Sequence, residues 1–167
     1  MVPGLIILLP VLGAFASWLL SRRSDGTSIR AHALLAAVAP FTGALLLASH
    51  WPQASDQNAL ITTVQWIPQL GLDLSFRLDG LSWLFATLIT GIGCLIILYA
   101  RYYFDGKANA PRFFILIQLF MTAMLGIVLS ENLLFMLVFW ELTSLVSFLL
   151  IGFTWSSRGA RRGARMS

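Results

Sequence analysis

The sequence predicts an all-α membrane protein with five transmembrane helices. Hydrophobic residues make up 58% of the 167 residues and charged residues only 11%, so the chain lacks the polar surface that a soluble domain of this size needs. Its apolar residues also form five runs long enough to cross a bilayer. In lipid such runs satisfy their backbone hydrogen bonds as helices. We therefore expect residues 1–167 to form a single transmembrane domain.

The first two runs are joined by a short basic connection. The first run, Val2–Leu20, has no basic segment before it and is longer than the usual core of a signal peptide, so it is expected to be an uncleaved span. The second run is Ala31–Ser49. Arg22, Arg23 and Arg30 flank the connection, and basic residues in short loops favour the cytoplasmic side.

The outer loop 51–77 is the one long connection, and its second half predicts a small β-hairpin. Ile61–Ile67 is strand-like, and residues 68–71 have the composition of a turn. From Leu72 to Leu78 apolar and polar residues alternate, which is typical of a strand with one buried face. The hairpin is expected to cover the outer end of the helices.

The last three runs are Leu81–Ala100, Phe113–Leu129 and Leu133–Phe153. Basic residues flank the connection between the third and fourth runs and fill the tail, residues 154–167, whereas the connection between the fourth and fifth runs has no lysine or arginine. This alternation predicts an external N-terminus and a cytoplasmic C-terminus. The basic residues concerned are Arg101, Lys107, Arg112, Arg158, Arg161, Arg162 and Arg165.

The composition argues against several classes of function. The net charge of +4 comes from clusters beside apolar runs, which membrane topology explains better than nucleic-acid binding does. The single cysteine, Cys94, offers neither a disulfide nor a metal-ligand spacing, and is expected to pack as a small apolar residue. Phosphate loops, nucleophile elbows and metal clusters are absent from the sequence. We therefore expect no cofactor, no metal and no enzymatic active site.

Glu141 is the residue most indicative of function. It lies near the centre of the fifth run, where an ionised carboxylate costs about 2.5–3.5 kcal/mol to insert, and such residues usually carry ions or protons. On a helix, Ser144 falls within about 60° of Glu141, and Phe148 almost directly beneath it. We expect this stripe to point inward. The alternative is a protonated glutamate that hydrogen-bonds across a helix interface only for packing.

Asp79 and Gln118 are further supporting candidates, together with Ser144. Asp79 begins the third run beside Arg77, where an ion pair or a helix N-terminal carboxylate is favoured over a role in an ion access path. Gln118 lies deep in the fourth run and is expected to bond to a neighbouring helix, with Glu141 or Ser144 as candidate partners.

Three other titratable residues lie at the ends of runs. Glu131 is expected to cap the fifth helix. His32 and His50 bracket the second run and are expected at the two membrane boundaries. None of the five runs contains a lysine or arginine. A buried carboxylate exchanges protons near neutral pH when a cation offsets the cost of burial, so the partner of Glu141 must come from another chain or from sequence outside these 167 residues.

The motif around Glu141 resembles a known family. The segment Phe139–Ser144 reads FWELTS and the segment Ser147–Phe153 reads SFLLIGF. Both are similar to the A subunit of multisubunit (Mrp-type) monovalent cation/proton antiporters, which are relatives of the antiporter-like subunits of complex I. The resemblance also includes RLDGLS at Arg77–Ser82 and LITGIG at Leu88–Gly93, and hence covers most of the chain from residue 77 to residue 153.

This resemblance implies that Glu141 is the proton carrier and works with lysines on later helices of a much longer protein. It also implies exchange of cytoplasmic Na⁺ or K⁺ for external H⁺, other antiporter subunits as partners, and a place in the plasma (inner) membrane of a bacterium. The chain would then be an N-terminal fragment, a truncated or frameshifted gene product, or a wrongly assigned reading frame, and inactive alone.

Three alternatives stay open at this point. The first is a proton-translocating antiporter-like subunit of a complex I type enzyme, in which the same glutamate helps proton movement coupled to quinone reduction. Hydrogenase-like, iron–sulfur or quinone-site genes nearby would favour it. The second is a structural or assembly protein in which Glu141 only bonds to a partner helix. The third is a nonfunctional remnant.

Overall fold

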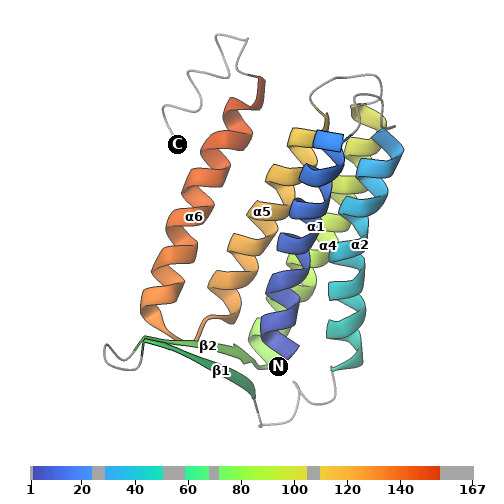
Figure 1. The fold of residues 1–167 in the computed structure, drawn as a ribbon. Helices are drawn as coiled ribbons and strands as arrows, with labels where there is room; N and C mark the ends of the chain where they lie inside the picture. Colours follow the sequence, from blue (N-terminus) through green and yellow to red (C-terminus); the bar gives the residue numbers. More distant parts are fainter. Residues whose placement is uncertain (1, 24–28, 51–58, 68–71, 105–109, 155–167) are drawn as a thin grey trace.

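The computed structural model contains five long helices and one two-stranded sheet among the residues it describes (Figure 1). These are residues 2–23, 29–50, 59–67, 72–104 and 110–154. The elements are α1 (Val2–Arg23), α2 (Ile29–Ser49), β1 (Leu60–Ile67), β2 (Leu72–Leu78), α4 (Gly80–Tyr103), α5 (Ala110–Leu129), α6 (Leu133–Ile151) and a short 3₁₀ turn, η2 (Gly152–Thr154).

All five helices are long and apolar enough to cross a membrane, which confirms the predicted fold class. The helix α5 begins three residues before the predicted run and includes Pro111 in its first turn, where the missing N–H of proline costs no hydrogen bond. The predicted turn at residues 68–71 and the basic tail from residue 155 onward lie outside the described residues.

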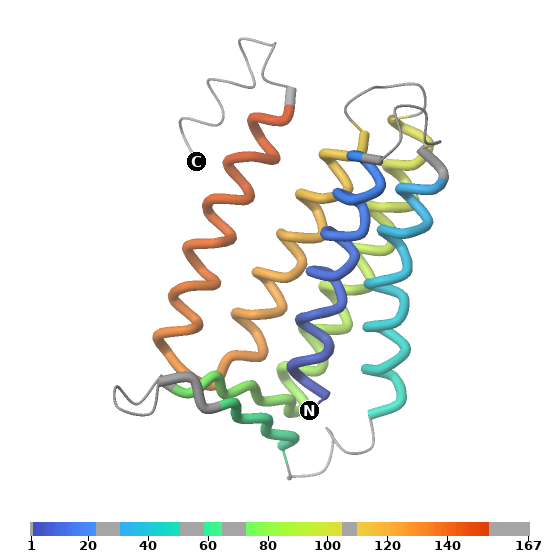
Figure 2. The backbone as a smooth tube through the Cα atoms, in the orientation of Figure 1, coloured from blue at the N-terminus to red at the C-terminus, as the bar shows by residue number. Residues whose placement is uncertain are grey.

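Four of the helices pack around one another, and α6 lies at the edge. The helix α1 packs on α5 and α2, α2 packs on α4, and α4 packs on α5. We call α1, α2, α4 and α5 the four-helix group. The helix α6 packs mainly on α5, and Figure 2 shows it on the outside of the bundle.

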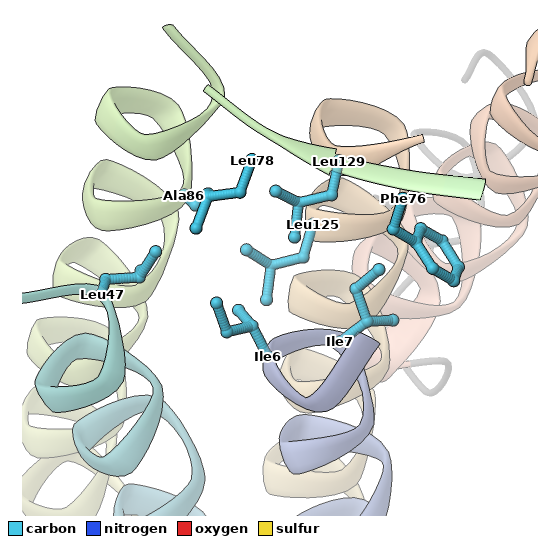
Figure 3. Close-up of a cluster of buried hydrophobic side chains, with 8 residues drawn as sticks. All are labelled: Ile6, Ile7, Leu47, Phe76, Leu78, Ala86, Leu125 and Leu129. Carbon is cyan, nitrogen blue, oxygen red and sulfur yellow. The ribbon is translucent and has the colours of Figure 1, made fainter. Parts of the chain in front are cut away.

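The hairpin covers one end of the four-helix group, as the alternating pattern predicts. Strands β1 and β2 are antiparallel, with Leu60 opposite Leu78 and Val64 opposite Leu74. The inner side chains of β2 join a buried cluster to which all four helices of the group contribute (Figure 3). The cluster consists of Ile6, Ile7, Leu47, Phe76, Leu78, Ala86, Leu125 and Leu129.

A second apolar cluster lies nearer the opposite end, where α1 and α4 end and α2 and α5 begin (Figure 1). His32, in the first turns of α2, is only 1% exposed. The protein itself therefore covers this side chain at the end of the span, and its expected place at a membrane boundary stays a prediction. The cluster includes Ala33, Ala36, Ile97, Ala100, Phe104, Ala110, Phe114 and Ile117.

Candidate functional site

Glu141 lies near the middle of α6, as the sequence predicts, but its side chain is exposed on the outside of the bundle. The stripe of Glu141, Ser144 and Phe148 was expected to point inward. All three residues are exposed in the structure. The expectation is therefore wrong for this chain, and the stripe faces away from the four-helix group.

The reason is that another stripe of α6 makes the contact with the bundle. Phe139 packs against the first apolar cluster, and Val146 is 1% exposed. In the turn η2 that follows α6, Phe153 packs edge-on against Phe104 with ring centroids 5.5 Å apart. The spacing of Phe139 and Val146, seven residues, places them on one face of the helix. At 100° per residue, Glu141 lies about 140–160° away from these two side chains.

A close approach between Phe139 and Gly126 of α5 fixes this face of α6. A Cβ atom at Gly126 would overlap the Phe139 ring, so the glycine makes room for it. Small residues of this kind let transmembrane helices approach closely and gain van der Waals contact. The local sequence of α5 thus determines which face of α6 turns inward, and consequently that Glu141 turns outward.

The hydroxyl groups around Glu141 bond to their own helix. The Thr143 hydroxyl donates to the Trp140 carbonyl oxygen at 2.6 Å, and the Ser147 hydroxyl donates to the Ser144 carbonyl oxygen at 2.9 Å. Within the described residues, no hydrogen bond or ion pair joins Glu141 to Ser144 or to any other side chain. Its carboxylate is therefore available to a group from outside this chain.

Gln118 is fully buried and bonds across to another helix, as expected, but to a different partner. Its amide nitrogen donates to the Ser17 hydroxyl of α1 at 3.4 Å and to the Phe114 carbonyl oxygen at 3.3 Å. Its amide oxygen lies against Gly13 of α1, where a Cβ atom would overlap it. Glu141 is not its partner, because Gln118 faces α1 while α6 packs on another side of α5.

Asp79 is the N-cap of α4, which confirms the interpretation as a helix N-terminal carboxylate. Its Oδ1 accepts from the Ser82 backbone N–H at 2.9 Å, and the Ser82 hydroxyl accepts from the Asp79 backbone N–H at 2.7 Å. Its Oδ2 lies 3.3 Å from Nε of Arg77. The hydrogen bond from the Ser82 backbone, helped by the Ser82 hydroxyl and the Arg77 charge, lowers the pKa of Asp79.

Glu131 does not cap α6. The N-cap is Asn132, whose side-chain oxygen accepts from the Leu134 backbone N–H at 2.9 Å. The Glu131 backbone N–H instead donates to the Ser75 carbonyl oxygen of β2 at 2.9 Å. The prediction is wrong because the backbone N–H of Glu131 bonds to the strand β2, so that the next residue caps the helix.

This pairing with β2 brings Glu131 to the same cavity as Asp79. The cavity has a volume of about 540 Å³ at the hairpin end of the bundle, between the start of α4 and the end of α5. Asp79, Arg77 and Glu131 supply its charged lining. Sequence reasoning missed this arrangement, since residues 79 and 131 are joined by a strand contact that no local pattern indicates.

Comparison with known proteins identifies proteins that are similar to large parts of this chain. Residues 65–114 match the family described as NADH-ubiquinone oxidoreductase (complex I), chain 5 N-terminus. The chain is 48% identical over 137 residues to the probable K⁺/H⁺ antiporter A/B subunit of Rhizobium meliloti (strain 1021). It is 46% identical over 110 residues to the Na⁺/H⁺ antiporter A1 subunit of Staphylococcus haemolyticus (strain JCSC1435).

These two matches cover 78% and 66% of this chain, and in each case 14% of the relative's length. The chain thus spans about one seventh of the curated relatives it matches. Among solved structures, the Mrp complex from Dietzia sp. DQ12-45-1b superposes with a TM-score of 0.75 at 28% identity, covering 90% of this chain and 16% of that chain. Sequence and fold thus agree with the resemblance inferred from the Glu141 motif: over the part that it spans, the chain is similar to antiporter A subunits.

Proposed function

We propose that this chain contributes a proton-binding site to a secondary antiporter complex that exchanges cytoplasmic Na⁺ or K⁺ for external H⁺, with Glu141 as the proton carrier. One observation carries the proposal: a single carboxylate lies at mid-span on α6, on the face that points away from the four-helix group. The relatives supply the class of function, since they are antiporter subunits.

The position of Glu141 requires a covering partner. An ionised carboxylate facing lipid at that depth costs about 2.5–3.5 kcal/mol on insertion scales. Within the described helices the arginines lie at the ends of α1, α2, α4 and α5, and α6 has none. The partner that covers Glu141 therefore supplies both the seal against lipid and the cation. We propose that it belongs to the rest of a longer protein or to an equivalent chain, and that this chain alone is inactive.

The electrochemical gradient drives the exchange. Moving one charge through the membrane potential is worth about 2.3 kcal/mol per 100 mV, which expels cations when more protons enter than cations leave. The proposed orientation has an external N-terminus and a cytoplasmic C-terminus, in the plasma membrane of a bacterium. It agrees with the arginines of α1, α4 and α5, which share the end opposite the hairpin (Figure 1).

The supporting residues have separate roles in this proposal. Ser144 lies on the exposed face of α6 beside Glu141, where its hydroxyl is placed to share the site with the incoming partner. Asp79 lines the cavity at the hairpin end and provides negative charge where external protons arrive. Gln118 holds α1 on α5 and so supports the helix on which α6 packs.

The test is Glu141→Gln in the full-length protein within its complex, in inverted membrane vesicles. We expect cation-dependent proton flux to be abolished, because glutamine keeps the size and hydrogen bonding of the side chain but does not exchange a proton. The matched control is Asp73→Asn on β2, which makes the same chemical change outside the helices. Normal flux in Glu141→Gln would refute the role of proton carrier.

A second candidate function follows from the family description of residues 65–114, which names a complex I chain. In that case Glu141 serves proton movement coupled to quinone reduction. Neighbouring genes for iron–sulfur or quinone-site subunits favour this candidate, and genes for small antiporter subunits favour antiport. A purely structural Glu141 predicts a third result: Glu141→Gln leaves activity unchanged, while Glu141→Leu weakens assembly.

A further inference from the structure

A groove lies between α2 and α4, on the side of the four-helix group remote from α6. Its volume is about 360 Å³. The small side chains of Ala33, Ala37 and Cys94 leave the hollow, and larger exposed apolar side chains such as Val38 and Leu98 border it. The groove is therefore apolar along most of its length and opens to the surroundings of the bundle.

One end of the groove is charged. Arg101 is the one charged side chain among the described residues that line it. It lies in the last turn of α4, seven residues after Cys94, so the groove extends about 10 Å along the helix. Since half of the hydrocarbon core of a bilayer is about 15 Å thick, the groove runs from the membrane boundary well into the apolar region.

The surroundings of Arg101 also place it at the level of the lipid headgroups. Its guanidinium carbon lies 5.6 Å from the centre of the Tyr102 ring. Tyr99, Tyr102 and Tyr103 are all more than half exposed, and tyrosines of this kind favour the boundary between lipid and water. Within the described residues no carboxylate pairs with Arg101, so its charge is open to an anion from outside the chain.

We propose that this groove binds an anionic phospholipid, with one acyl chain between α2 and α4 and the phosphate at Arg101. Guanidinium groups bind phosphate through paired hydrogen bonds, and basic pockets between transmembrane helices bind anionic headgroups. A phospholipid matches both parts of the groove at once. An apolar partner helix would match the hollow but would leave Arg101 without an anion. The site is distinct from Glu141 and does not depend on antiport.

The experiment uses the full chain in phosphatidylcholine vesicles that contain a trace of photoactivatable lipid. The tracer carries a diazirine on its acyl chain and is either phosphatidylglycerol or phosphatidylcholine, and the labelled residues are mapped by mass spectrometry of peptides. We expect the anionic tracer to label the groove about fivefold more than the zwitterionic one, since a basic residue near the surface contributes about 1 kcal/mol to binding anionic lipid.

The variants separate the two parts of the site. Arg101→Gln should remove the preference for the anionic tracer, and Arg101→Lys should keep most of it. Ala37→Leu fills the hollow and should reduce labelling by both tracers. The matched control is Arg112→Gln, because Arg112 is an exposed arginine in the first turns of α5 at the same end of the bundle. This variant should retain the full preference.

Three outcomes would overturn the proposal. Equal labelling of the groove by both tracers would remove the anionic specificity. A preference that survives Arg101→Gln would assign it to another residue. If, in the assembled complex, photoactivatable groups placed in the groove crosslink to another protein of the complex and not to lipid, the groove is a protein interface.

Discussion

The polar side chains of the four-helix group and of α6 differ in burial and in hydrogen bonding. Inside the group, Gln118 is fully buried and bonded to α1, and Ser17 is equally buried beside it. On α6, Glu141 is exposed and has no bonded partner among the described residues. Polar groups within a membrane are costly unless they are paired or wet. These two polar side chains of the four-helix group are therefore enclosed by protein, although the amide oxygen of Gln118 is buried without a hydrogen-bond partner. Glu141 has no such enclosure, and under the proposed function another protein element covers it.

Glycines at helix contacts also differ between the two regions. At Gly13, a Cβ atom would overlap Gln118 and come within 3.0 Å of the Ala39 Cβ atom, so α1 is held between two helices. At Gly126, the three nearest atoms that a Cβ atom would meet all belong to the Phe139 ring of the peripheral α6. At Gly13 the end of the Gln118 side chain can move aside, but the Ala39 Cβ atom is fixed to the backbone of α2, so α1 or α2 would have to shift. The contact at Gly126 relaxes when α6 moves outward.

The largest expected effect tests this difference directly. Gly13→Ala should destabilise the chain by about 1–3 kcal/mol, the usual cost of overpacking, and Gly126→Ala should cost less because Phe139 and α6 can shift. The control is Gly91→Ala on α4, where nothing lies within 4 Å and alanine should stabilise by about 0.5–1 kcal/mol through helix propensity. The measurement is the unfolding free energy in detergent micelles, followed by circular dichroism. A larger loss at Gly126 than at Gly13 would contradict the comparison.

The sequence predicts most of the four-helix group because its signals are local. Apolar length defines the helices, alternation from Leu72 to Leu78 defines β2, and the place of Asp79 at the start of the third run predicts a helix N-terminal carboxylate. Glu141 is also located correctly along α6. These features depend on neighbouring residues in the chain, and so the pattern is enough to find them.

The direction in which Glu141 faces could not be predicted, because it depends on a contact between α5 and α6. A charged residue in an apolar helix is expected inside a protein, but within this chain Glu141 is exposed. In this chain the contact of Phe139 with Gly126 turns Glu141 outward instead. The bonding partners of Gln118 and Glu131 could not be predicted for the same kind of reason: these partners, Ser17 and Ser75, are distant in sequence.

An intermediate effect is expected at the hairpin end of the group. Asp79→Ala removes the cap of α4 and should cost about 1 kcal/mol at neutral pH. Folding lowers the pKa of Asp79, chiefly through the Ser82 backbone N–H. The stabilisation is therefore complete above the ordinary aspartate value of about 3.9 and is lost as the pH falls through the lower folded value. The measurement is the unfolding free energy of both proteins against pH.

The control for this pH dependence is Asp79→Asn, which keeps a capping side chain but does not titrate. The difference in stability between the wild type and Asp79→Ala should shrink in acid, while the difference between Asp79→Asn and Asp79→Ala should stay constant. If the first difference is the same on both sides of about pH 3.9, the carboxylate does not act as the charged cap.

The smallest expected effects are those of substitutions at Gln118 and Glu141. Gln118→Leu removes a long hydrogen bond between α1 and α5 and should destabilise the isolated chain by about 0.6 kcal/mol, the average for such bonds in membranes. Glu141→Leu should cause no loss, since Glu141 bonds to nothing among the described residues. In the assembled complex the order should reverse, with Glu141→Leu weakening assembly more than Gln118→Leu. Unfolding in micelles gives the first comparison, and co-purification of the other subunits gives the second. The same ranking in both settings would mean that the outer face of α6 has no partner, and the difference between the two regions would then lie in packing alone.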